Sequence, residues 1–219
     1  DVAYQLGQVT CEALRTVVIN TTQSWCGNRF GKGLVRPGGT NYPLSVEKAE
    51  EIHRNITEVG WRFAEMTDRI YTLPTVLARF EDVGILTSDQ AIMTGTVGLA
   101  ARTCGIARDI RSTHPFQYFR KYPIEPVIQE KGDLLARGRQ RALEAAQSVR
   151  IITELLDVWK SIRKDQPRPV YNYSLKPSAY GIALTEGWRG EICHSLVTDE
   201  KGDILNYKVK DPSFHNWMA

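Results

Sequence analysis

The fold class is decided by residues 46–71, which read VEKAEEIHRNITEVGWRFAEMTDRIY. Apolar side chains recur in this stretch at spacings of three and four, as they do along one face of an α-helix. These positions are Ala49, Ile52, Ile56, Val59, Phe63, Met66 and Ile70. Ser45 lies directly before the stretch and can cap its first turn. The pattern therefore predicts a long amphipathic helix from about Val46 to about Tyr71.

A second long helix is predicted from about Asp133 to Arg163. Pro167 and Pro169 are expected to end it, because proline cannot continue a helix. Its apolar stripe consists of Ala145, Val149, Ile152, Leu156 and Trp159. Two long helices with matching stripes are expected to pack against each other at the shallow angle of helix bundles. Further helices are predicted at Val2–Gln23, Leu73–Phe80 and Ser88–Met93, the last begun by a capping box of Thr87 and Gln90.

The residue pattern changes from helical to strand-like near the C-terminal end. Glu191–Thr198 and Ile204–Val209 are rich in β-branched and aromatic residues, which favour strands. The segment Asp199–Asp203 between them is a hairpin turn in which Gly202 can supply a left-handed conformation. The sequence thus predicts a mainly α (α+β) fold, with a helix bundle over residues 1–165 and a small antiparallel hairpin within residues 166–219. Both parts are expected to belong to one domain.

Composition excludes some classes of protein. With 219 residues, 42% of them hydrophobic, the chain can bury a substantial core. The 28 basic and 25 acidic residues give a net charge of +3 without a basic run, which argues against nucleic-acid binding. The stretch lowest in charge, Ile85–Ala101, contains Asp89 and is too rich in Gly and Thr to span a bilayer. No secretory signal opens the chain. Both ends look cut, which predicts a piece of a longer protein.

The cysteines are Cys11, Cys26, Cys104 and Cys193, at wide spacings and without a C-x-x-C pair. Neither a zinc nor an iron–sulfur pattern can be read from them. In a helix-rich intracellular chain such cysteines are expected to stay reduced.

Three clusters combine glycine with arginine. The first runs from Cys26–Phe30 to Arg36–Thr40, where Pro37-Gly38-Gly39 indicates a turn. The second, Ala101–Arg111, holds three arginines and Asp109 and is followed by His114-Pro115-Phe116. Such a segment could bind an anion, but internal ion pairing is the favoured interpretation, with little stabilisation if the pairs are exposed. His114 is expected to be a hydrogen-bonding loop residue.

The third cluster, Glu186–His194, places a glycine on each side of Trp188-Arg189. The glycines allow a sharp turn that presents the guanidinium, which stays charged at any physiological pH. The alternative, a surface arginine in a loop, is as common.

Taken in order, the three clusters resemble the large subunit of nickel–iron hydrogenases. The resemblance is to the membrane-bound, formate-hydrogenlyase type, which shares ancestry with the 49-kilodalton subunit of respiratory complex I. It is carried by Arg36–Thr40, by Gly105–Arg111 with His114–Phe116, and by Glu186–Glu191 with the segment down to Trp217. It extends over almost the whole chain in co-linear order.

The resemblance implies a site. In that family two C-x-x-C motifs hold nickel and iron, one before this region and one after it, so the nickel–iron centre is expected in the full-length protein and not in this chain. The family's Glu-Ala-Pro-Arg-Gly motif places an arginine above the open metal position, and this arginine matches Arg189. Glu186 matches the motif's acid, and His194 matches a histidine five residues after the arginine. Gly187 and Trp188 depart from the usual alanine and proline.

The function implied is hydrogen evolution or uptake coupled to the oxidation of formate, carbon monoxide or ferredoxin. An iron–sulfur small subunit and membrane subunits would be its partners, on the cytoplasmic, inner face of the cell membrane. Arg189 and His194 favour this reading over a complex I-like NADH- or ferredoxin:quinone oxidoreductase, whose subunit generally has lysine for the arginine and lacks the histidine. A metal-free interaction scaffold is a third reading. The chain alone is expected to be inactive and to self-associate through apolar surface.

Overall fold

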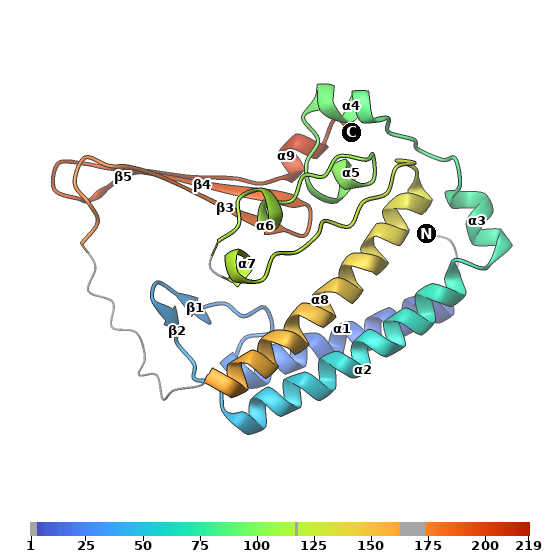
Figure 1. Ribbon diagram of the computed structural model, residues 1–219, viewed down its shortest axis with the longest axis horizontal. Coiled ribbons are helices and arrows are strands. Elements are labelled where there is room, and N and C mark those ends of the chain that lie inside the picture. Colours follow the sequence, from blue (N-terminus) through green and yellow to red (C-terminus); the bar gives the residue numbers. More distant parts are fainter. Residues whose placement is uncertain (1–3, 117, 163–173) are drawn as a thin grey trace. The chain divides into compact units, whose positions relative to one another are not determined.

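A computed structural model of the chain describes residues 4–116, 118–162 and 174–219 (Figure 1). The chain divides into two compact units. Unit 1 comprises Asp1–Ala78 and Ala142–Asn172, and unit 2 comprises Arg79–Arg141 and Tyr173–Ala219. Helix α8 (Leu134–Ile162) begins in unit 2 and continues in unit 1. The predicted last residue of this helix, Arg163, and the two prolines after it lie outside the described residues.

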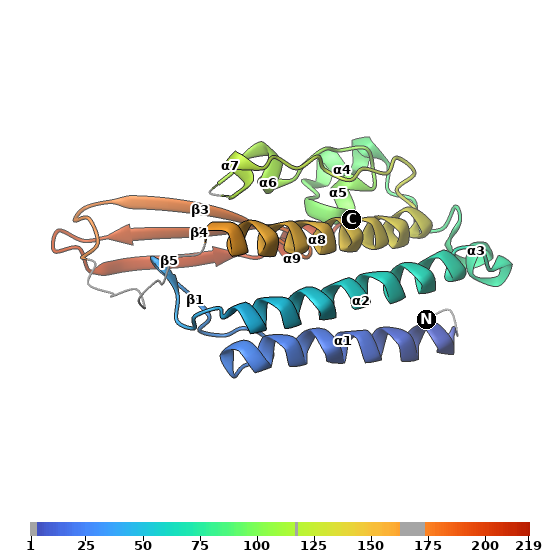
Figure 2. The ribbon, with the colours of Figure 1, turned by 60° about the horizontal axis from the view of Figure 1, so that its bottom comes forward.

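Unit 1 is built on long helices. Helices α1 (Gln5–Cys26) and α2 (Val46–Ile70) run side by side along their length (Figure 2), and α3 (Pro74–Phe80) follows α2. The Ser45 side chain accepts a hydrogen bond from the Lys48 backbone N–H, so the predicted N-cap of α2 is confirmed. Helix α1 ends three residues after the predicted end at Gln23, because it continues until Gly27 ends it in a left-handed conformation with φ 73°.

The core of unit 1 joins α2 and α8. Ala49, Ile52 and Ile56 of α2 are buried together with Leu156 of α8. Partly buried side chains complete this cluster: Trp25, Leu44, Val149, Ile152 and Trp159. The prediction that the two apolar stripes meet is therefore confirmed. The first glycine cluster forms a short exposed hairpin of β1 (Val35–Arg36) and β2 (Gly39–Thr40), as the turn interpretation predicted.

Unit 2 contains short helices in a loop-rich segment. The capping box of Thr87 and Gln90 is confirmed at the start of the first of them. Leu86, Ala91 and Cys104 form a small buried cluster with Ile106 packed against it. The short helices of the unit are α4 (Ser88–Thr94), α5 (Gly98–Arg102), α6 (Ile110–Thr113), α7 (Tyr118–Lys121) and α9 (Ser213–Asn216).

An antiparallel sheet completes unit 2. Its strand order is β3–β4–β5, formed by Tyr180–Gly187, Gly190–Thr198 and Ile204–Lys210. Strands β4 and β5 coincide with the two predicted strands, but the prediction of a two-stranded hairpin was incomplete because β3 pairs with β4 along its whole length. The fold is mixed α/β and rich in helix.

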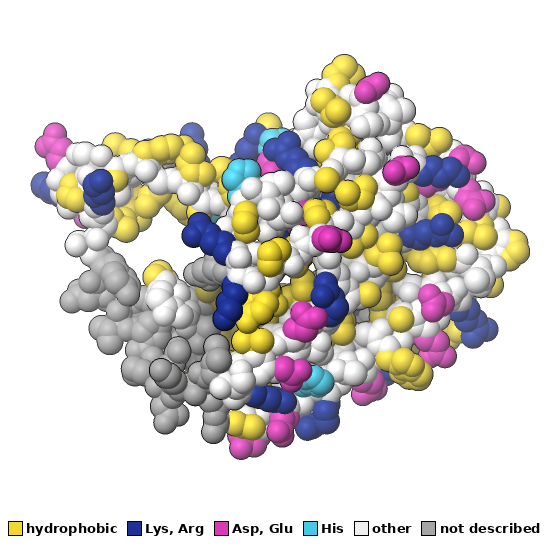
Figure 3. Space-filling model, in the orientation of Figure 1, with side chains coloured by type: hydrophobic (Ala, Val, Ile, Leu, Met, Phe, Trp, Pro, Cys, Tyr) yellow, Lys and Arg dark blue, Asp and Glu magenta, His cyan; other side chains and the backbone are white. Residues whose placement is uncertain are grey.

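The sheet carries exposed apolar side chains, visible along its strands in Figure 3. Six of them are more than half exposed: Tyr180 (65%), Ile182 (59%), Ile204 (61%), Leu205 (70%), Tyr207 (55%) and Val209 (51%). This is apolar surface of the kind expected from the sequence. Within the described part of the chain, no helix combines the length and the apolar character needed to cross a membrane.

Candidate functional site

A buried arginine organises the second glycine–arginine cluster. The side chain of Arg102, at the end of α5, is only 1% exposed. Its Nη1 donates to Glu186 Oε1 at 2.8 Å and to the Arg108 carbonyl at 2.9 Å, and it lies 3.6 Å from Asp109 Oδ2. Arg111 donates to both oxygens of Asp109, at 3.0 and 2.7 Å. Internal pairing is confirmed, and the side chains of Arg102, Asp109 and Glu186 are buried.

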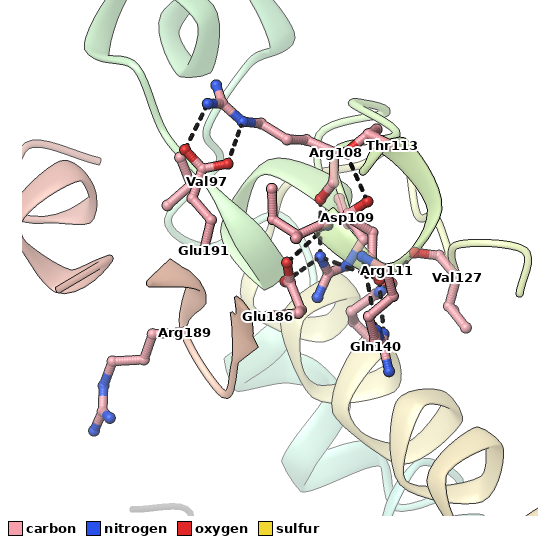
Figure 4. Close-up of polar contacts among 12 residues, drawn as sticks. Val97, Arg108, Asp109, Arg111, Thr113, Val127, Gln140, Glu186, Arg189 and Glu191 are labelled. Carbon is pink, nitrogen blue, oxygen red and sulfur yellow. Dashed lines mark hydrogen bonds and ion pairs between the residues drawn. The ribbon is translucent and has the colours of Figure 1, made fainter. Parts of the chain in front are cut away.

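A second arginine reaches the next strand. Arg108 binds Glu191 through two hydrogen bonds, from Nε at 3.0 Å and from Nη2 at 2.7 Å. Glu186 also accepts the Ile110 backbone N–H on its other oxygen, at 3.0 Å. Figure 4 shows how these contacts join the loop to β3 and β4. The six residues Arg102, Arg108, Asp109, Arg111, Glu186 and Glu191 are called the arginine–glutamate network below.

The two buried acids of this network titrate differently. Burial alone would raise the pKa of Asp109, but hydrogen bonds from Arg111 and the positive charges of Arg111 and Arg102 hold that pKa below its usual value. Burial raises the pKa of Glu186 above its usual value, because the hydrogen bonds from Arg102 and from the Ile110 backbone offset only part of the desolvation.

The network flanks a tight turn. Gly187 and Gly190 are opposite each other in the β3–β4 register, so Trp188 and Arg189 form a two-residue loop. Trp188 is 56% exposed, and the Arg141 guanidinium lies 5.1 Å from its ring centroid. Arg189 is exposed, and in Figure 4 its side chain points away from the network. Among the described residues its guanidinium forms no hydrogen bond or ion pair.

The backbone of this turn is held by residues that the sequence analysis missed. Asn216 of α9 donates from Nδ2 to the Arg189 carbonyl at 3.0 Å. Gly98, at the start of α5, packs against Gly190 so closely that a Cβ on Gly98 would lie 2.2 Å from the Gly190 Cα. Nothing in a single sequence marks either residue, since both contacts are long-range.

The three predicted site residues occupy different places. Arg189 is exposed in the turn, while Glu186 faces the buried network. His194 lies further along β4, where its Nδ1 is 2.6 Å from Tyr207 Oη and the two rings stack. Across the ranges that the structure describes, none of the three bonds to another. His114 pairs with Thr113 Oγ1 at 3.0 Å, in keeping with a hydrogen-bonding loop residue.

The described residues do not fit a nickel–iron centre. They contain no group of three or more histidine, cysteine or acidic side chains able to hold a metal. The thiols of Cys26 and Cys104 donate to backbone carbonyls, at 3.3 Å and 3.2 Å. Burial raises the pKa of the Cys11 and Cys104 thiols, which favours the protonated form over the thiolate that binds metals. All four cysteines are free.

Comparison with known proteins identifies the family. Residues 1–173 match the sequence model described as "Respiratory-chain NADH dehydrogenase, 49 Kd subunit". The chain belongs to this family. The match to the 49-kDa subunit family runs from α1 through α8 and includes the loop that carries Arg102 and Arg108. The resemblance to the complex I subunit is confirmed at this level.

Individual relatives come from both branches. The carbon monoxide-induced hydrogenase of Rhodospirillum rubrum is 26% identical over 94% of this chain and 56% of its own length. An NADH-quinone oxidoreductase subunit of Deinococcus radiodurans is 25% identical over 89% of this chain and 54% of its own length. The NADH-ubiquinone oxidoreductase 49 kDa subunit of Dictyostelium discoideum is 29% identical over 86% and 52%. The chain spans about half the length of these oxidoreductase subunits, which support both branches equally.

Proposed function

We propose that the chain is part of the catalytic large subunit of a nickel–iron hydrogenase, which evolves or takes up hydrogen in an assembly of the formate-hydrogenlyase type. The observation that carries the proposal is the geometry of Arg189. Its guanidinium is exposed, yet its backbone sits in a two-residue turn held by Asn216, Gly98 and the arginine–glutamate network. A charge held in this way can be presented to a reaction centre supplied from outside the described residues.

The chemistry of arginine suits this role. The guanidinium stays protonated at any physiological pH and offers five donors, so it can stabilise negative charge or orient a polarised group opposite it. In this proposal Glu186 does not act on substrate, because its two oxygens are taken up by Arg102 and by the Ile110 backbone. It fixes the strand that leads into the turn. His194, paired with Tyr207, would be a neighbouring polar group.

The complete protein would supply the metals. Because the described residues do not fit a nickel–iron centre, its thiolate ligands would come from other parts of the complete protein. The hydrogenase relative from R. rubrum supports this assignment. An iron–sulfur small subunit and membrane subunits are the proposed partners, at the inner face of the cell membrane, with electrons from formate, carbon monoxide or ferredoxin.

A second candidate is the quinone-reducing branch. The description of the matching family and the NADH-quinone relatives support it. In that case the same fold would serve a complex I-like assembly. A metal-free interaction scaffold is a third candidate, supported by the exposed apolar side chains of the sheet.

The test uses the complete protein in its assembly. We expect stoichiometric nickel and hydrogen-dependent dye reduction, and we expect Arg189→Ala to lower that activity by about a hundredfold or more. Arg139→Ala is the matched control, because Arg139 is an exposed arginine of the same unit. Quinone reduction without nickel would support the second candidate. If the protein showed neither activity and bound no nickel, the scaffold would be the remaining candidate. Undiminished hydrogen turnover in Arg189→Ala would remove Arg189 from the reaction.

A further inference from the structure

One side-chain amide links two distant backbone segments at the turn. Asn216 Oδ1 accepts the Val97 backbone N–H at 3.0 Å, and Asn216 Nδ2 donates to the Arg189 carbonyl at 3.0 Å. Val97 is the N-cap of α5 and its own side chain cannot cap the helix. Asn216 therefore uses both ends of its amide, one on the start of α5 and one on the Arg189–Gly190 peptide.

A backbone contact with Gly98 also restricts the conformation of the Arg189–Gly190 peptide. A Cβ built on Gly98 would lie 2.4 Å from the Arg189 carbonyl oxygen and 2.5 Å from the Gly190 nitrogen. Gly190 has a φ of 130°, a conformation that side-chain-bearing residues rarely adopt. Without its restraints, a turn bounded by Gly187 and Gly190 has many accessible conformations, since glycine is the least constrained residue.

Among the described residues no hydrogen bond or ion pair holds the guanidinium of Arg189, although its charge acts on Asp211. Its direction therefore depends on the backbone from which the side chain departs. We infer that Asn216 is a positioning residue for Arg189, which fixes the Arg189–Gly190 peptide and through it the direction of the guanidinium. The consequence for turnover rests on the proposed function, whereas the fixing of the turn does not.

The substitution Asn216→Asp separates the two ends of the amide. An aspartate keeps an acceptor for the Val97 N–H but places a carboxylate oxygen against the Arg189 carbonyl, where a donor is needed. Asn216 is partly exposed, so the new charge can be hydrated. Asn206→Asp is the matched control, because Asn206 is an exposed asparagine on β5 of the same unit.

The first measurement is amide hydrogen exchange in the complete protein. We expect the amides of Gly187 and Gly190, which face each other where the hairpin closes, to exchange at least about tenfold faster in Asn216→Asp, because the turn opens locally. Asn206→Asp should leave them unchanged, and equal melting temperatures would show that both variants fold. Unchanged exchange at the turn in Asn216→Asp would overturn the inference.

The second measurement is a double-variant cycle on hydrogen-dependent dye reduction. Asn216→Asp should lower kcat about ten- to hundredfold with Arg189 present, and should cause no further loss in an Arg189→Ala background. Independent, multiplicative losses would assign Asn216 a general structural role and overturn the inference. If Arg189→Ala alone leaves hydrogen turnover unchanged, the role proposed for Arg189 in the reaction fails, and hydrogen exchange still decides whether Asn216 fixes the turn.

Discussion

Gly98 and Gly190 lie backbone against backbone, so closely that neither position has room for a side chain. A Cβ on Gly190 would lie 2.9 Å from both the Cα and the nitrogen of Gly98, and Gly98 itself has a φ of 63°. This contact brings the start of α5 directly onto the turn that carries Arg189.

Gly98→Ala should therefore be strongly destabilising. We expect a loss of about 3 kcal/mol or more in the free energy of unfolding, from the left-handed backbone and from overlap with an unyielding neighbour. Gly95→Ala is the control, because Gly95 has a similar φ of 69° with nothing within 4 Å, and should cost only about 1–2 kcal/mol. Urea titration checks both, and equal losses would contradict the close contact.

Arg102→Met should cost about 3–5 kcal/mol, because it leaves the buried carboxylates of Glu186 and Asp109 without their shared partner. Asp82→Asn is the control. Asp82 pairs with Lys131 at 2.9 Å on the surface, with 70% of its side chain exposed, so its loss should cost less than about 1 kcal/mol. Denaturant midpoints for unit 2 provide the measurement, and similar midpoints for both variants would argue against a buried network.

Asp133 gives a pH prediction. Its Oδ1 accepts the Ala136 N–H at 2.7 Å, so it caps α8, and its side chain is fully buried. Burial alone would raise the pKa of Asp133, but backbone hydrogen bonds from Ala136 and Asp82 and the charge of Lys131 lower it.

Since the folded pKa lies below the unfolded one, Asp133 stabilises the fold above about pH 4 and loses that contribution as the pH falls further. The stability lost between about pH 6 and about pH 3 should be smaller in Asp133→Asn, which keeps a capping oxygen but not the charge. Urea midpoints measured across this pH range test the prediction. A larger loss of stability in Asp133→Asn than in the unchanged protein would contradict it.

Gly60 of α2 lies close against α8 in the core of unit 1. A Cβ on Gly60 would lie 2.9 Å from Val149 Cγ1, so Gly60→Ala should lose about 1–2 kcal/mol to overpacking despite alanine's better helix propensity. Val149→Ala makes the space that the new methyl needs. The double variant should therefore lose less than the sum of the two single losses, and strict additivity would refute the contact between α2 and α8.

Exposed apolar side chains on the sheet predict self-association of the isolated chain at high concentration. Tyr180 and Ile182 lie on one face of β3 and are 65% and 59% exposed. Replacing both by lysine should shift sedimentation toward monomer, whereas Val35→Lys, on the exposed hairpin of unit 1, should not. A chain that is strictly monomeric at every concentration would count against the prediction.

Local signals explain what the sequence predicted correctly. The stripe from Ala49 to Ile70, the Ser45 cap and the Thr87–Gln90 capping box depend on spacings within one or two turns of helix, and all are present in the structure. Strand β3 was missed, although Tyr180, Ile182 and Leu184 alternate. Gly181 and Ala183 between them weaken the strand signal.

The site was less predictable, because its contacts join remote segments. The composition of the Ala101–Arg111 segment indicated ion pairing, but it could not indicate that Arg102 pairs with Glu186, 84 residues away. The sequence also did not indicate that the charged side chains of this segment are buried, since a run of charges ordinarily lies on the surface. The amide bridge made by Asn216 depends on Val97 and Arg189 meeting in space, which local pattern does not encode.

Glu186 and Glu191 are opposite each other in the β3–β4 register, and like charges at facing positions disfavour pairing of the strands. Each acid is compensated by an arginine 84 or 83 residues earlier in the chain. Closing this hairpin should therefore be a late step of folding, because the strands gain their counterions only once the Arg102–Arg108 loop has packed against them. A chain synthesised from its N-terminus contains that loop before either glutamate is added, so the order of synthesis matches the order that the charges require.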